Sequence, residues 1–280
     1  MYNYYYMELL PTWYMVTIVF LLGLIIGSFL DVIVCRFHTG KSINGRSRCM
    51  SCGHTLSWYE LFPLASYLIL RGRCKNCNGT IPVRLLLMEL VTGILFLVVY
   101  FTTASLLSLG LALVVVSLLI VIAVYDIKHM VIPHEFVFAV LALACVSLLV
   151  QMNFIVNLPF IIAHLTSAVG ASLFYASLWV MSKGKWIGLG DAKLAFPLAL
   201  MLLPLQSFSM VVLSFWIGAG VSVVLLLVQK LLQSGKKHLP FLRIPLTMKS
   251  EVPFAPFMLL AFLAVFLMQV NVLSFMENLF

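Results

Sequence analysis

The sequence predicts an all-α polytopic membrane protein with about eight transmembrane helices and a cytosolic insert that holds a four-cysteine zinc site. Three observations support this fold class. Of the 280 residues, 63% are hydrophobic and 9% are charged, and the mean hydropathy is +1.13, which excludes a soluble globular surface. Apolar runs long enough to cross a hydrocarbon core of about 30 Å recur along the chain. Four of the six cysteines fall in one polar stretch.

The apolar runs are separated by short polar segments, and we expect each run to form a helix. Their approximate limits are 13–34, 85–102, 105–125, 135–151, 159–181, 193–207, 210–229 and 253–270. The sixth run is the shortest, and Pro197 and Pro204 interrupt it. Proline removes a helical hydrogen bond, so we expect a kink or a partly re-entrant segment at this point.

The distribution of basic residues predicts how these helices are oriented in the membrane. If the N-terminus lies outside, all 17 Lys and Arg residues fall in cytosolic segments, as the positive-inside rule requires. The net charge of +8 therefore indicates topological bias and some attraction for anionic lipid, and not a nucleic-acid-binding surface. We expect three parts: a first transmembrane helix (1–36), the cytosolic insert (37–83) and a larger transmembrane domain (84–280).

The insert contains two Cys-x-x-Cys pairs. Cys49 and Cys52 form the first pair, and Cys74 and Cys77 follow after 21 residues. This spacing is close to that of a four-cysteine zinc site, and zinc would fold a loop too short for its own apolar core. The alternative is two disulfides or two redox pairs, which a reducing cytosol disfavours.

Two acidic residues stand at the ends of apolar runs, where a carboxylate near the bilayer is costly. Asp126 closes the run 105–125, and Asp191 immediately precedes the run 193–207. The predicted topology places both at the cytosolic membrane edge, so they can meet. Two facing carboxylates in a low-dielectric cleft cannot both ionise easily, so one keeps a proton while the other activates water. The pattern predicts aspartic peptidase chemistry, with the two carboxylates as general base and general acid.

The neighbours of Asp191 fit such a site. Gly188 and Gly190 lack a Cβ atom, which lets a substrate strand approach the backbone closely. Lys193 would adjust the charge state of Asp191 or simply mark the positive side of the membrane. The alternative is that both aspartates are interfacial acids, paired with lysines, that serve only topology or stability.

Tyr-Asp at the end of one helix and Gly-x-Gly-Asp at the start of another resemble the motifs of the GxGD membrane aspartic peptidases. The presenilin and signal peptide peptidase branch carries a later Pro-Ala-Leu motif, which this sequence lacks. The prepilin peptidase branch resembles the chain over about 27–257, with its motifs in the right order. The matching segments are 27–33, 58–61, 71–74, 88–93, 125–126, 132–133, 188–194 and 252–257.

This resemblance implies cleavage of type IV prepilin or pseudopilin precursors after a glycine, at the cytosolic face of the bacterial cytoplasmic membrane, with Asp126 and Asp191 as catalytic residues. Many family members also methylate the new N-terminus with S-adenosylmethionine, and the region of the cysteine pairs is associated with that activity. By resemblance, Asp31, Glu60 and Glu89 are expected to contact the substrate or the methyl donor. The family often has asparagine at the position of Asp31.

Three other functions use the same features. A proton-coupled transporter would use the acidic pair as a relay, but its site should lie near the middle of the bilayer. A membrane thiol-disulfide carrier would use the cysteine pairs as redox centres. A non-catalytic assembly scaffold would use the insert and helices only as an interface. None of the three accounts for the ordered set of motifs.

Overall fold

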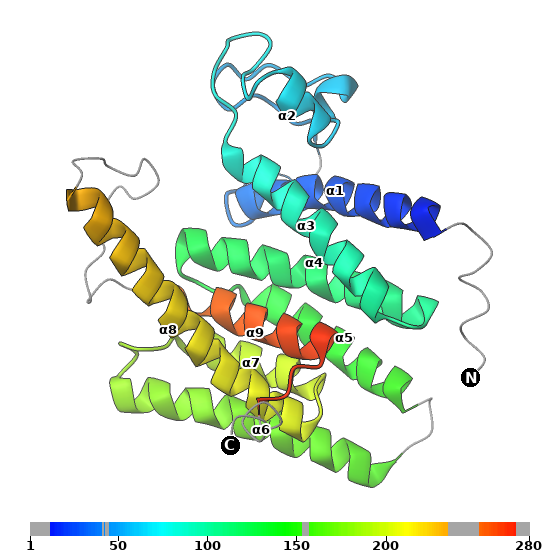
Figure 1. Ribbon diagram of the computed structural model, residues 1–280, viewed down its shortest axis with the longest axis vertical. Helices are drawn as coiled ribbons and strands as arrows, with labels where there is room; N and C mark the ends of the chain where they lie inside the picture. The colour runs from blue at the N-terminus through cyan, green and yellow to red at the C-terminus, as the bar shows by residue number, and fades with distance from the viewer. Residues whose placement is uncertain (1–11, 41, 43–44, 153–156, 235–251, 273–280) are drawn as a thin grey trace. The chain divides into compact units, whose positions relative to one another are not determined.

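The computed structural model describes residues 12–40, 42, 45–152, 157–234 and 252–272. Over these ranges the chain is helical, with two isolated β-bridges and no strand (Figure 1). The apolar helices are α1 (Thr12–Arg36), α3 (Val83–Thr102), α4 (Leu106–His129), α5 (His134–Gln151), α6 (Leu158–Ser182), α7 (Leu189–Leu200), α8 (Pro204–Ser234) and α9 (Ala255–Met268). The insert adds the short helices η1 (Trp58–Leu61) and α2 (Ala65–Ile69). The predicted all-α fold class is confirmed.

Six of these helices, α1, α3, α4, α5, α6 and α8, are long and apolar enough to cross a membrane by length and composition. The other two apolar helices are shorter, with 12 residues in α7 and 14 in α9. At 1.5 Å per residue they extend only about 18 and 21 Å, less than the hydrocarbon core of about 30 Å.

The predicted limits of the sixth apolar run, 193–207, are wrong. The helix α7 begins earlier, at Leu189, and ends at Leu200, and α8 begins at Pro204. Pro204 opens α8 because the first turn of a helix needs no N–H from that residue. Pro197 stays inside α7. The predicted loop after α8 falls largely within 235–251, outside the described residues.

The chain divides into two compact units, Met1–Val121 and Ile122–Phe280, and the division falls within α4. In the first unit, α1 packs on α3 at very short range through glycines. A Cβ atom at Gly23 would lie 2.7 Å from the Gly93 Cα, and one at Gly27 would lie 2.8 Å from the Met88 carbonyl oxygen. Small residues of this kind let membrane helices approach closely.

In the second unit, α7 is the central helix. It packs against α5, α6, α8 and α9. Eight of its 12 residues are buried, including both its polar start at Asp191 and its apolar end at Leu200. The short helix is therefore covered by protein on most sides, so that the polar residues at its start are held within the protein.

Candidate active site and metal centre

Asp191 lies in the first turn of α7, and its two carboxylate oxygens have different surroundings. Gly188 caps the helix in an extended conformation, and its N–H donates to Asp191 Oδ2 at 3.1 Å. The other oxygen, Oδ1, is buried and accepts no hydrogen bond from the described residues. The side chain is therefore held at one oxygen, while the second has no hydrogen-bond partner among the described residues.

Asp126 lies in the last turn of α4 and is buried. The backbone N–H of Ala255, at the start of α9, hydrogen-bonds its carboxylate. The first N–H groups of a helix have no partner within the helix, so they are natural donors to an anion. The segment 252–257 resembles the family, but the sequence alone indicates no role for it. The structure shows that it supports Asp126.

The two aspartates interact in the structure, although they lie in helices that are far apart in the sequence. Both belong to the second unit, and the charge of Asp126 acts on Asp191. The loop before α5 also contacts the start of α7, because Ile132 packs on Gly190. A Cβ atom at Gly190 would lie 3.2 Å from the Ile132 Cβ. A glycine at position 190 thus lets α7 begin directly against the segment that follows Asp126.

Gly188 and Lys193, both predicted as supporting residues, have different positions relative to Asp191. The Gly188 N–H contacts Asp191 directly, as described above. Lys193 is exposed although Asp191 is buried two residues earlier in the same helix. The structure therefore places Lys193 on the outer face of α7.

Sequence reasoning missed Tyr175 of α6. Its side chain is completely buried, its hydroxyl lies 2.7 Å from Ser214 Oγ of α8, and Asp191 acts on it electrostatically. The ring also packs on Phe254, directly before Ala255. Tyr175 thus lies within electrostatic range of Asp191 and packs beside the residue that precedes Ala255. A tyrosine within an apolar run gives no signal for this role, because only tertiary packing brings it to the site.

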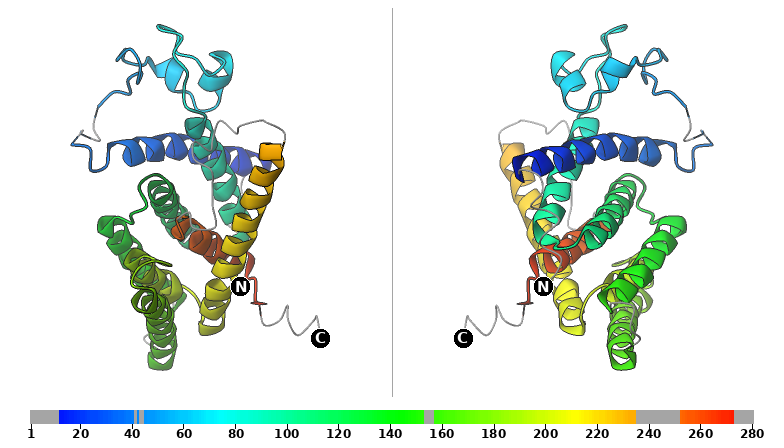
Figure 2. Two further views of the ribbon diagram at one scale, coloured as in Figure 1. Left: turned by 90° about the vertical axis from the view of Figure 1, so that its left-hand side faces the viewer. Right: turned by 90° about the vertical axis from the view of Figure 1, so that its right-hand side faces the viewer.

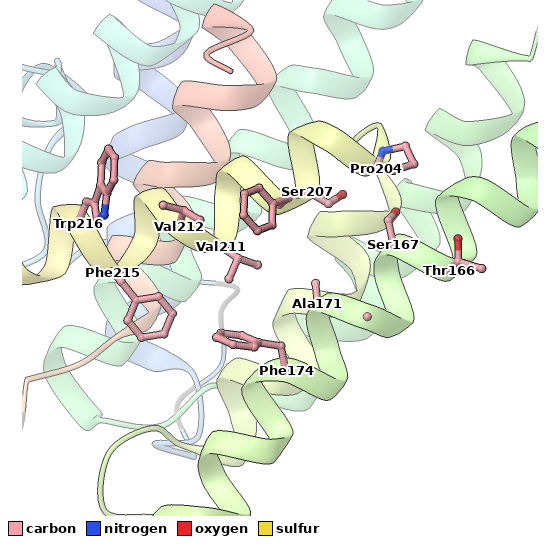
Figure 3. A pocket seen from close by; sticks show the side chains of 12 residues that line it. Thr166, Ser167, Ala171, Phe174, Pro204, Ser207, Val211, Val212, Phe215 and Trp216 are labelled. Carbon is pink, nitrogen blue, oxygen red and sulfur yellow. The ribbon is translucent and has the colours of Figure 1, made fainter. Parts of the chain in front are cut away.

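A cavity of about 650 Å³ lies between α6 and α8 (Figure 3). Phe174 and Phe215 line it at one end, and Thr166 and Ser167 line it at the other. Phe215 is also stacked on Tyr175, with ring centroids 6.0 Å apart. One aromatic layer therefore links this largely apolar cavity with the tyrosine beside Asp191.

The four cysteines of the insert converge on one point. Their Sγ atoms all lie within 4.8 Å of one another, and the sulfurs of Cys49 and Cys77 are 3.8 Å apart. A tetrahedral zinc with Zn–S bonds of about 2.3 Å requires sulfurs about 3.8 Å apart, so this donor set fits zinc. Backbone N–H groups of Cys52 and Ser51 lower the pKa of the Cys49 thiol to about 6, which favours the thiolate form that binds metal.

The two cysteine pairs have the same local structure, for which the sequence carries a signal. Each lies in an Arg-Cys-x-x-Cys-x-x-Thr segment, at 48–55 and 73–80. In each segment the Arg and Thr form an isolated bridge, and the first cysteine donates its N–H to the carbonyl five residues on. The repeated segment builds two equivalent halves of the four-cysteine cluster.

The three acidic residues predicted from resemblance in the N-terminal part have structural partners. Asp31 forms an ion pair with Arg84 at 2.9 Å. Glu89 accepts a hydrogen bond from the Leu64 N–H at 2.8 Å, which ties the insert to α3. Glu60 accepts from the Ser57 N–H at 2.7 Å at the start of η1.

Comparison with known proteins agrees with this geometry. Residues 21–103 match a family described as Bacterial Peptidase A24 N-terminal domain, and residues 113–223 match the Type IV leader peptidase family. Together the two matches cover more than half of the chain, and each of the two units contains most of one match.

The relatives include proteins called prepilin leader peptidase/N-methyltransferase. The one from Bacillus subtilis is 34% identical over 74% of this chain and 83% of its own length. The one from Dichelobacter nodosus is 30% identical over 77% of this chain and 86% of its own length. The one from Myxococcus xanthus is 47% identical, but the match covers 41% of this chain and 34% of that protein. No solved structure matches. The chain therefore belongs to the type IV leader peptidase family.

Proposed function

We propose that this chain cleaves the leader from type IV prepilin or pseudopilin precursors after a glycine, with Asp126 and Asp191 as the catalytic pair. One observation carries the proposal: two buried carboxylates from distant segments interact, and the Asp191 Oδ1 atom has no partner among the described residues. Family membership and the names of the relatives support the same activity.

The two carboxylates would act on a water molecule and the scissile peptide bond. The ionised aspartate removes a proton from the water, and the water oxygen attacks the carbonyl carbon of the leader glycine. The other aspartate, protonated at the start, gives its proton to the leaving amine nitrogen as the C–N bond breaks. The protons balance, and each aspartate ends in the state in which the other began.

The catalytic pair would work at the cytosolic face of the bacterial cytoplasmic membrane. All 17 Lys and Arg residues fall on one side of the predicted topology, and Asp126 and Asp191 lie at that edge. A precursor anchored in the bilayer with a basic leader on the cytosolic side would present its cleavage site at this depth.

We further propose that the chain N-methylates the new N-terminal residue, as the names of its relatives indicate for those proteins. S-adenosylmethionine would supply the methyl group. The carboxylates of Asp31, Glu60 and Glu89 are the side chains we propose to attract the positively charged amine or the methyl donor. Cys49, Cys52, Cys74 and Cys77 would hold a structural zinc ion that folds the insert.

Cleavage of a membrane-inserted precursor tests the catalytic pair. Asp126→Asn and Asp191→Asn should each lower the cleavage rate by about 10²- to 10⁴-fold, the usual contribution of a general acid or base. Glu135→Gln is the control, because it removes an exposed carboxylate outside the pair, in the first turn of α5, and should leave cleavage unchanged.

The result also separates the alternatives. Cleavage at the parental rate by either variant, with the helical fold intact, would exclude the two-aspartate mechanism and leave a scaffold or carrier role. The comparisons support neither the proton-coupled transporter nor the thiol-disulfide carrier.

A further inference from the structure

The zinc insert exposes a large apolar surface. Trp58 is 74% exposed, Phe62 54%, Leu68 68% and Ile69 79%. A scattered apolar residue needs no explanation, but exposed aromatic and aliphatic side chains concentrated in so small an insert indicate a surface that is covered in the functional state.

The aromatic rings contact one another, and the aliphatic side chains lie on the neighbouring helix. The Trp58 ring makes edge contacts with Tyr59 and Phe62, both at 5.9 Å between ring centroids. The helix η1, which carries Trp58 and Tyr59, packs on α2, which carries Leu68 and Ile69. We call Trp58, Tyr59, Phe62, Leu68 and Ile69 the aromatic face.

The charge around the aromatic face has one sign. Lys75 lies at its edge, with its Nζ 3.3 Å from the Tyr59 hydroxyl and 5.2 Å from the centre of that ring. Other exposed cations of the insert are Arg46, Arg48, Arg71 and Arg73. The only acidic residue of segment 37–83 is Glu60, which is buried and hydrogen-bonded to Ser57. The insert thus presents apolar rings and positive charge, with no exposed carboxylate on its described residues.

The insert also cannot move far from the bilayer. It joins the end of α1 to the start of α3, and both helices are long enough to span a membrane. The insert lies beside α1 and beyond the first residues of α3 (Figures 1 and 2). Both of its ends are therefore held at the ends of membrane helices.

We propose that the aromatic face docks on the cytosolic surface of the chain's own membrane, with its rings among the headgroups and its cations paired with anionic phospholipids. Trp and Tyr favour this interface, and Lys and Arg are attracted by the negative surface potential of the cytosolic leaflet. A protein partner of this face would need acidic groups around an apolar centre. The tethering and the charge favour lipid, and the proposal does not depend on the peptidase activity.

Photo-crosslinking of the full chain in nanodiscs tests this docking. A benzophenone amino acid would replace Trp58 or Ile69 on the aromatic face, His54 as an exposed control on the first cysteine segment, and Trp216 on α8 as a control within the membrane. In phosphatidylcholine discs that contain phosphatidylglycerol, positions 58, 69 and 216 should form lipid adducts, and position 54 should not.

A second pair of variants tests the contribution of charge to the docking. Lys75→Ala should lower the lipid adduct at position 58 by up to about fivefold in the anionic discs and have little effect in pure phosphatidylcholine. Lys185→Ala, a second exposed lysine in the other unit, is the matched control and should change nothing. Adducts at 58 and 69 with this chain, a second copy or a precursor, or no lipid adduct there while position 216 reacts, would overturn the proposal.

Discussion

At the scale of single residues, Asp126 and Asp191 depend on backbone N–H groups from other positions. Gly188 donates to one oxygen of Asp191, and Ala255 donates to Asp126. In both contacts the donor is a backbone N–H group. A sequence pattern therefore shows only that a glycine or another small residue lies at a fixed distance from a motif. Asp191 Oδ1 has no hydrogen-bond partner among the described residues, and we propose this atom for proton transfer.

The interaction of the two carboxylates predicts the pH dependence of cleavage. The pair works with one proton: below the first apparent pKa of the pair no base remains, and above the second no acid remains. The rate should therefore rise and then fall with increasing pH. Initial rates of precursor cleavage across the pH range, at saturating substrate, measure this profile. A rate that rises to a plateau without a descending limb would contradict a shared proton.

At the scale of helices, α1 and α3 are in close contact. This contact brings together in space the segments 27–33 and 88–93, which both resemble the family. Gly27 meets the backbone of α3 at Met88 and Glu89, and the Arg84–Asp31 ion pair lies farther along the same helix pair. Polar residues with proposed roles are thus fixed by glycine contacts along two apolar helices.

Gly27→Ala tests this packing. The new methyl group would lie 2.8 Å from a backbone oxygen and 2.9 Å from the Glu89 Cα, so the helices must separate. We expect a loss of about 1–3 kcal/mol in the free energy of unfolding, as for other overpacked positions. The measurement is unfolding of the detergent-solubilised chain.

The matched control for that substitution is Gly110→Ala in α4. A Cβ atom there would meet nothing within 4 Å. Alanine is the better helix former, so this variant should be unchanged or more stable by about 0.5–1 kcal/mol. Equal stabilities for the two variants would show that α1 and α3 do not depend on the close approach.

At the scale of the whole molecule, the chain separates the two kinds of site. The four-cysteine cluster and the Asp31 ion pair belong to the unit Met1–Val121, and Asp126 and Asp191, the proposed catalytic pair, belong to the unit Ile122–Phe280. Each unit has its own packing of helices, so damage to one site need not reach the other.

Removal of the metal tests that separation. The purified chain should contain one zinc ion per molecule, measured by elemental analysis, and Cys49→Ser should lose it. Because the cysteines fold only the insert, methylation of a cleaved product should be lost and precursor cleavage should be retained. Cys145→Ser, outside the cluster, is the control. Equal loss of both activities in Cys49→Ser would show that the insert also supports the peptidase.

The sequence by itself determined the features that depend on local chemistry and on the bilayer. Hydropathy predicted the apolar helices, because a membrane requires long apolar segments. Spacing predicted the cysteine cluster, because a tetrahedral metal accepts four thiolates from two short turns. The cost of burying charge singled out Asp126 and Asp191 among nine acidic residues.

Tertiary structure decided the features that depend on contacts between distant segments. It ended α7 at Leu200 and began α8 at Pro204, where the sequence predicted a single run over 193–207, kinked or partly re-entrant at its prolines. It paired Asp31 of α1 with Arg84 of α3, which lie far apart in the sequence. It placed Tyr175 beside Asp191 and the Ala255 N–H on Asp126. Such contacts are set by how helices pack, and a tyrosine or a backbone amide carries no sign of its partner until the helices are in place.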